Sequence, residues 1–229
     1  MGILRARINP LAKPGGRYVS LQTKATVEDL YRVPENGKAE LVGGVLVMMA
    51  ETGFLPGRAG GEIYASLRDY EEEYGSGYAL PDNVGFLVNL PDRRNVEIYW
   101  DTGRGCEQLI TDLAARESFS PDAAYYVGEP TGADFLDGAL IFAVEVRSKH
   151  DYGERAEKAM ARKRSDYFAA GTQVVWDVDV LKGEWVKVYR IDSPDRPTVY
   201  GRGELAEAEP ALPGWTLQVD RLLPKSAGN

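Results

Sequence analysis

The sequence has little of the chemistry that cysteine and histidine provide. Cys106 is the only cysteine and His150 the only histidine among the 229 residues. A single cysteine cannot form an intramolecular disulfide, and one thiol with one imidazole cannot build a zinc cage. The single histidine also disfavours catalysis by a histidine-based triad, and we predict a surface-loop position for His150.

Long apolar segments and an excess of basic residues are also absent. No segment approaches the roughly 20 apolar residues that span a bilayer. The N-terminus has no hydrophobic signal core, so we expect a cytoplasmic protein that makes no membrane contact. The net charge of −8 argues against a non-specific coat for nucleic acid, because such binding relies on clustered Lys and Arg. The glycines between 57 and 61 lack Walker spacing, which disfavours a nucleotide-binding loop.

No linker divides the chain, and we predict one domain over residues 23–224, preceded by an arm. Residues 1–22 contain prolines and glycines and little periodicity, which predicts an extended N-terminal arm. The first 24 residues hold five basic side chains and no acidic one. The arm could therefore touch phosphates, although a solvated tail is the simpler interpretation.

Short apolar strands that alternate with two core helices predict an α/β fold with a mixed sheet flanked by helices. Gly43-Gly44 joins two apolar segments and predicts a β-hairpin. The periodicity predicts helices over 62–74 and 152–170, and the Gly/Pro-rich residues before 62 predict a loop. Spacing within 107–116 suits a helix, and we predict that residues 101–119 form an insertion or an extra pair of elements. Strands are predicted within 78–90, 95–100, 123–127, 140–146, 173–179, 185–189, 198–200 and 215–219.

A charged residue interrupts the most apolar of these strands. Leu140–Val144 predicts a strand that is covered on both faces, and Glu145 follows it directly. A lone carboxylate in that position would carry a large desolvation cost, so we expect a cation or a metal ion as its partner. In the next helix Lys163 shares one face with Met160 and Tyr167, because these positions have helical spacing. We therefore predict that Lys163 points toward the core beside Glu145.

A second acid opens the strand at 123–127. If this strand pairs with the strand of Glu145, Asp122, Glu145 and Arg147 would bring two carboxylates and a cation together. Mg²⁺ prefers oxygen ligands, usually one or two carboxylates with water and substrate phosphate. Such an ion activates water and neutralises charge that develops on a phosphodiester. Glu40, near the predicted hairpin, could add a ligand or orient one, and Lys163 would place positive charge near the attacking water.

The chain resembles the Uma-two family of restriction-endonuclease-like proteins, within the PD-(D/E)XK nuclease superfamily. Order and spacing agree from about Thr23 to Leu223. Each motif alone is weak, and their order makes the resemblance specific. The matching segments are Lys38–Val47, Ser120-Pro121-Asp122, Val144–Ser148, Lys163 with Tyr167–Gly171, and Trp176–Asp179.

The resemblance implies a restriction-endonuclease-like fold and a Mg²⁺ site, with Mn²⁺ as an alternative, at Asp122 and Glu145. In this family the lysine is displaced to the following helix, which matches Lys163, and Glu40 matches an upstream acid. The implied function is a metal-dependent endonuclease that hydrolyses DNA. The implied partners are DNA and a second copy of the chain in a homodimer. Departures are Arg147 in place of an aliphatic residue, Lys149-His150 in place of Pro-Ser, a missing histidine in 53–61, and a longer segment over 93–117.

Simpler interpretations of the same residues stay open. Glu145 could form only a structural ion pair with Lys163 or Arg147, Asp122 could merely open its strand, and Glu40 could be a charge at a sheet edge. Two other functions also stay open. The chain could be a catalytically silent module that keeps the fold for binding or regulation, or a hydrolase of a small phosphate ester.

Overall fold

The computed structural model describes residues 25–33, 38–49, 52–101 and 106–224, and for residues 91–115 it describes the backbone alone. The arm predicted for residues 1–22 lies outside the described residues. The described helices are α1 (Val27–Leu30), α2 (Phe54–Tyr74), α3 (Glu154–Ala170) and a 3-10 helix, η1 (Val219–Arg221). The described strands are β1 (Ala39–Val42), β2 (Val45–Met48), β3 (Tyr78–Pro81), β4 (Phe86–Asp101), β5 (Cys106–Phe119), β6 (Ala123–Tyr126), β7 (Leu136–Asp137), β8 (Phe142–Val146), β9 (Val174–Asp179), β10 (Trp185–Arg190), β11 (Ser193–Tyr200), β12 (Leu205–Glu207) and β13 (Thr216–Gln218).

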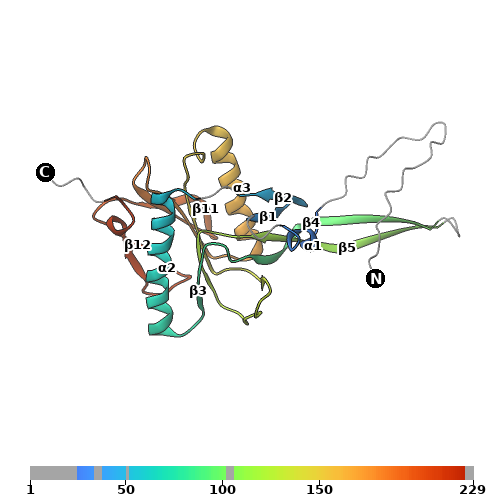
Figure 1. Cartoon of the computed structure of the whole chain (residues 1–229), viewed down its shortest axis with the longest axis horizontal. Helices are drawn as coiled ribbons and strands as arrows, with labels where there is room; N and C mark the ends of the chain where they lie inside the picture. Colours follow the sequence, from blue (N-terminus) through green and yellow to red (C-terminus); the bar gives the residue numbers. More distant parts are fainter. Residues whose placement is uncertain (1–24, 34–37, 50–51, 102–105, 225–229) are drawn as a thin grey trace.

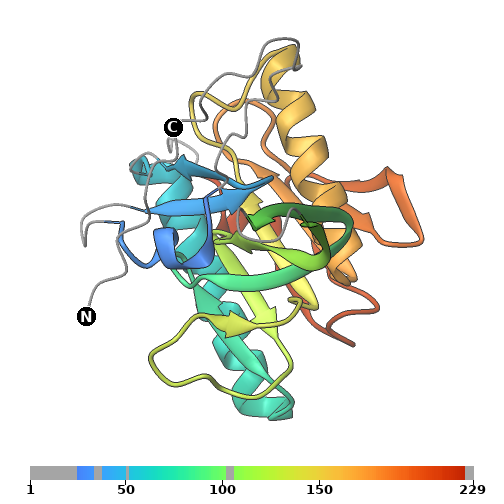
Figure 2. The same cartoon turned by 90° about the vertical axis from the view of Figure 1, so that its right-hand side faces the viewer.

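The strands form mixed sheets, and α2 and α3 lie on either side of the strands (Figure 1 and Figure 2). The larger sheet has the order β11-β10-β9-β8-β6-β3, in which β8 and β9 are parallel and the other neighbours antiparallel. A second sheet has the order β2-β1-β5-β4-β7, and β12 pairs with β13. The predicted α/β fold with a mixed, helix-flanked sheet is confirmed. In the described part of the chain, none of the helices has both the length and the apolar character that crossing a bilayer requires.

The central strand β8 is buried on both faces, as its apolar sequence predicts. Phe142 and Val144 contribute to the core that contains Ile63 of α2 and Trp176 of β9. Ala143, which alternates with them, belongs to the core on the side of α3. Because successive side chains of a strand point to opposite faces, Glu145 continues the α3 side. The alternation of side chains along β8 therefore places the Glu145 carboxylate on the face that packs against the helix of Lys163.

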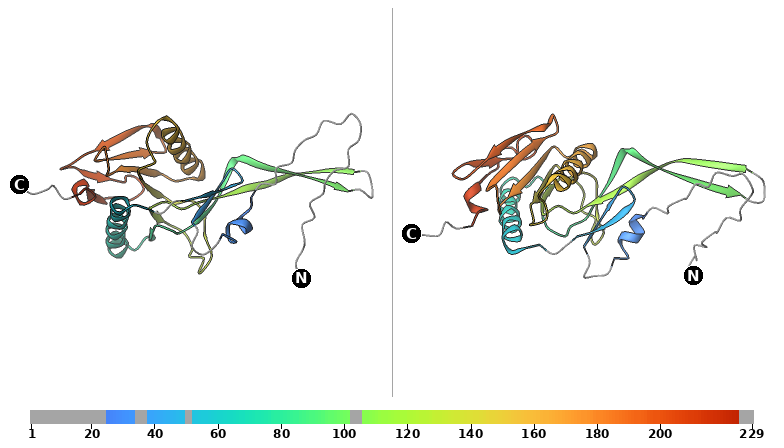
Figure 3. Two further views of the ribbon diagram at one scale, coloured as in Figure 1. Left: turned by 45° about the horizontal axis from the view of Figure 1, so that its top comes forward. Right: turned by 90° about the horizontal axis from the view of Figure 1, so that it is seen from above.

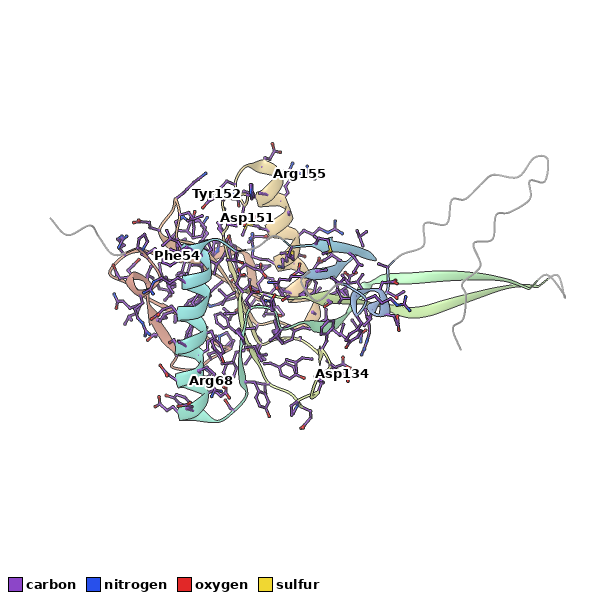
Figure 4. The ribbon with its side chains drawn as sticks, viewed as in Figure 1. Phe54, Arg68, Asp134, Asp151, Tyr152 and Arg155 are labelled. Atoms are coloured by element: carbon purple, nitrogen blue, oxygen red, sulfur yellow. The ribbon has the colours of Figure 1, made fainter. Side chains whose placement is uncertain are left out.

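Helix α2 begins earlier than the sequence pattern predicts. The Gly/Pro-rich residues before 62, predicted as a loop, form its first turns, and the helix starts at Phe54. Pro56 falls in the first turn, where a missing N–H is tolerated, while Ala59 and Ile63 are fully buried. Burial of these side chains outweighs the poor helix propensity of the glycines. Figure 4 marks the start of the helix with Phe54 and a position near its other end with Arg68.

The helix predicted within 107–116 is wrong. These residues belong to β5, which pairs antiparallel with β4 from Phe86–Phe119 to Asp101–Cys106. The two strands extend from the body as a long ribbon (Figure 1 and Figure 3). Apolar residues at 109, 110 and 113 have spacing that suits a helix, but pairing with β4 decides the conformation. The strand predicted over 95–100 is confirmed as part of β4.

Candidate active site

Backbone pairing brings Asp122 to Glu145. β6 and β8 are antiparallel, with Ala123 opposite Val144, and the Asp122 N–H donates to the Val144 carbonyl at 2.9 Å. The Asp122 carboxylate in turn accepts a hydrogen bond from the Val146 N–H at 2.7 Å. Asp122 is therefore held, through its N–H and its carboxylate, against the two residues that flank Glu145.

Lys163 joins two carboxylates that come from different sheets. Its Nζ lies 2.9 Å from Oε1 of Glu40 on β1 and 2.8 Å from the carboxylate of Glu145 on β8. The side chains of Glu40, Lys163 and Glu145 are 5%, 19% and 20% exposed. Glu40 Oε1 also accepts a hydrogen bond from the Ser120 N–H at 2.9 Å. The ammonium is thus fixed between two anchored acids rather than extended into water.

The site holds more negative than positive charge. Burial raises the pKa of Glu145 to about 7, and the charges of Asp122 and Glu40 add to this effect, whereas Lys163 opposes it. Burial also raises the pKa of Asp122, against the hydrogen bond from Val146. For Lys163 burial alone would lower the pKa, but Glu145 and Glu40 outweigh it, so the pKa is raised. Two carboxylates therefore contact an ammonium that stays protonated, and Asp122 lies within range of its charge.

The donor set fits a divalent cation that keeps other ligands. Among the described residues, no three His, Cys, Asp or Glu side chains are grouped so that they could hold a metal ion by themselves. Mg²⁺ needs fewer, because it usually combines one or two carboxylates with water and substrate phosphate. Asp122 and Glu145 supply hard oxygen atoms. Burial raises both pKa values, and a divalent cation beside the carboxylates would favour their charged forms. The residues present therefore suit Mg²⁺ or Mn²⁺.

The four residues singled out in the sequence, Glu40, Asp122, Glu145 and Lys163, lie together. Arg147 does not join them, so the prediction that its guanidinium lies beside Asp122 and Glu145 is wrong. Its side chain is 3% exposed, and the guanidinium donates to both carboxylate oxygens of Asp177 on β9, at 2.7 and 2.8 Å.

Arg147 also pairs with Glu157 on α3, and its guanidinium lies 5.0 Å from the ring centroid of Trp185. Asp177 is the register partner of Glu145 in the parallel pair β8–β9. A second buried ion-pair network therefore lies beside the candidate site, and Arg147 belongs to it.

Tyr167 is the residue of the site that sequence reasoning missed. The pattern places it simply in the core, and it is indeed 1% exposed. Its hydroxyl donates to Glu145 Oε1 at 2.6 Å. The sequence does contain a signal: Tyr167 follows Lys163 by one helical turn, and a buried phenol needs a hydrogen-bond partner.

The fold and the site define a restriction-endonuclease-like α/β protein. The model of the family Uma2, described as "Putative restriction endonuclease", matches residues 27–220. The chain belongs to this family, which confirms the resemblance seen in the sequence.

A solved structure has the same fold. It is described as a "putative nuclease belonging to DUF820" from Anabaena variabilis, is 15% identical to this chain and superposes with a TM-score of 0.61. The match covers 86% of this chain and 96% of the other. No curated protein sequence matches the chain.

Proposed function

We propose that the chain is a divalent-metal-dependent endonuclease that hydrolyses phosphodiester bonds of DNA. The observation that carries this proposal is the convergence of Asp122, Glu145 and Lys163 with the upstream acid Glu40, in a chain of the Uma2 family. Asp122 and Glu145 would hold Mg²⁺ or Mn²⁺. When bound, such an ion supplies Lewis acidity and lowers the pKa of a water ligand.

The side chains of this site have separate tasks in the proposal. Lys163 remains protonated and presents its ammonium to the negative charge that develops on the phosphoryl oxygens. Glu40, held by Ser120, keeps that ammonium in place. Tyr167 donates to one oxygen of Glu145 and so fixes the orientation of the carboxylate. Residues that are fixed before the substrate arrives lose little entropy when it binds.

Metal binding and DNA cleavage can be tested on one set of variants. We expect Mn²⁺ titrated by calorimetry to bind wild type, and to bind Asp122→Asn and Glu145→Gln at least tenfold more weakly. Plasmid nicking in Mg²⁺ should be abolished in both variants. Glu154→Gln is the matched control, because Glu154 is 84% exposed on the same helix as Lys163. Mn²⁺ binding that both site variants leave intact would contradict the proposal.

The same experiment separates the two other functions. Metal binding at Asp122 and Glu145 without nicking of any DNA would favour hydrolysis of a small phosphate ester. No metal binding by wild type would favour a silent module that binds or regulates. Assembly as a homodimer and a cytoplasmic location stay predictions, and sedimentation equilibrium would test the first of them.

A further inference from the structure

A pocket opens beside the candidate active site, between α2 and Asp122. It has a volume of about 170 Å³, and Asp122 forms part of its wall. Helix α2 contributes Gly57, Gly61 and Tyr64, and Thr52 contributes from the segment that precedes the helix. Because Asp122 is a proposed metal ligand, the pocket is continuous with the place where the reaction would occur.

Two glycines of this wall have no packing reason to lack a side chain. A Cβ atom on Gly61 would meet no atom within 4 Å, and one on Gly57 would lie 3.5 Å from the Thr52 methyl group, an ordinary contact. Gly60 differs, since its Cβ would lie 3.4 Å from the Asp122 carbonyl oxygen. Glycine inside a helix is unfavourable relative to almost any other residue. In α2 the missing side chains therefore create open volume rather than close packing.

The charged residues of the pocket wall are two acids, Asp82 and Asp122, and one of them is paired with a lysine. Lys38 forms an ion pair with Asp82, another residue of the pocket wall, and its side chain is 21% exposed. Burial raises the pKa of Asp122, and the charge of Lys38 is among those that oppose this rise. Lys38 is thus within electrostatic range of Asp122. The ion pair offsets the negative charge of Asp82, so a phosphate in the pocket would not face an unpaired Asp82 carboxylate.

We propose that the pocket receives one sugar–phosphate unit of the DNA strand next to the phosphodiester that is cut, and that Gly61 and Gly57 determine specificity by keeping it open. The proposal rests on the proposed nuclease function. The volume of about 170 Å³ is roughly tenfold more than the ~10–15 Å³ that a cavity needs to hold one water molecule, so the pocket has room for a group as large as a sugar with its phosphate. Thr52 and Tyr64 in the pocket wall both carry a hydroxyl group, and the bare helix backbone permits close approach.

The test fills the pocket without disturbing the helix. Gly61→Leu should place its side chain in the open volume, and leucine favours the helix more than glycine does. Ala65→Leu is the matched control, because Ala65 is exposed one turn further along α2 and outside the pocket wall. Fluorescence anisotropy with a labelled DNA oligonucleotide, in Ca²⁺, should show at least tenfold weaker binding for Gly61→Leu and less than twofold change for Ala65→Leu. Calorimetry should show Mn²⁺ binding unchanged in both.

Two further results decide the inference. Gly61→Ala, for which the Cβ has free space, should fold at least as well as wild type and show an intermediate loss of DNA affinity. Equal affinities of wild type, Gly61→Leu and Ala65→Leu would overturn the inference. If wild type binds DNA without nicking it, the nuclease function is contradicted. The DNA affinities of Gly61→Leu and Ala65→Leu then still decide whether the pocket binds the strand. Wild type that binds no DNA would overturn both.

Discussion

The hydroxyl of Tyr167 lies 2.6 Å from Oε1 of Glu145, and it donates a hydrogen bond that links α3 to β8. Lys163, one turn earlier on the same helix, contacts the same carboxylate at 2.8 Å. Two successive turns of α3 therefore hold one acid. These two contacts fix the position of the Glu145 carboxylate, and both favour its charged form. The contribution of each contact can be tested by its own substitution.

Tyr167→Phe removes the hydrogen bond and leaves the ring in the core. We expect the free energy of unfolding to fall by about 1–2 kcal/mol, because a buried carboxylate loses a donor. The pKa of Glu145 should rise further, since the hydroxyl favours the charged form. The pH at which Mn²⁺ binding is half-maximal should therefore move upward in calorimetric titrations. Tyr78→Phe, at a position 40% exposed on β3, should change neither quantity. Unchanged pH dependence in Tyr167→Phe would show that the hydroxyl has only a packing role.

Lys163→Met removes the ammonium that Glu40 and Glu145 share. Breaking a buried ion pair leaves uncompensated charge, and for partly exposed partners we expect a loss of about 2–4 kcal/mol of stability at pH 8. The loss should be smaller at pH 5, where the carboxylates can take up protons. Urea unfolding at the two pH values measures the difference. Lys158→Met, at a side chain that is 76% exposed, is the control, and an equal loss for both variants would exclude a buried role for Lys163.

The raised pKa of Glu145 predicts a pH dependence of stability in metal-free protein. Its pKa is about 7 in the folded chain against an ordinary value of 4.5, mainly because the carboxyl is buried. The folded state therefore binds the proton more tightly, so its contribution to stability is complete below pH 4.5 and is lost as the pH rises through about 7. The stability of wild type relative to Glu145→Gln should decline from pH 5 to 8 in EDTA. A constant difference over this range would contradict the assignment.

Arg147→Ala should damage the fold and spare the metal site. Asp177 is 1% exposed and would lose its bidentate partner, which predicts a loss of about 3–5 kcal/mol. Arg147→Lys should recover only part of it, because an ammonium cannot make the same paired contacts. Thermal unfolding measures both effects, and Mn²⁺ affinity of the folded protein should stay within threefold of wild type. Arg155→Ala is the control, since Arg155 is exposed near the start of α3 (Figure 4). A selective loss of Mn²⁺ binding would place Arg147 in the site.

Much of the site could be predicted from the sequence because it depends on local periodicity. The apolar segment of β8 identifies a buried strand, and helical spacing aims Lys163 at Glu145. The partner of Arg147 could not be predicted, because it depends on the parallel register that sets Asp177 beside Glu145. Nothing in the local sequence specifies which strand lies next to β8.

The two wrong secondary-structure predictions have a related cause. Glycine and proline before residue 62 predict a loop, but buried contacts of Ala59 and Ile63 keep the helix continuous. Apolar spacing in β5 suits a helix, but hydrogen bonding to β4 gives a strand. In both segments a long-range contact outweighs the local preference for secondary structure. Such contacts cannot be predicted from a short segment of sequence.

Lys163 and Arg164 are neighbours in α3, and they reach the two acids that lie side by side on β8 and β9. Lys163 contacts Glu145 at 2.8 Å, and Arg164 lies 3.7 Å from Asp177. To turn or slide, this part of the helix would have to break both ion pairs at the same moment. If a metal ion binds as proposed, this part of the helix would therefore keep its place before and after binding, and Lys163 would offset the charge of Glu145 while the site is empty. The proposed enzyme would then need no rearrangement of α3 between one reaction and the next.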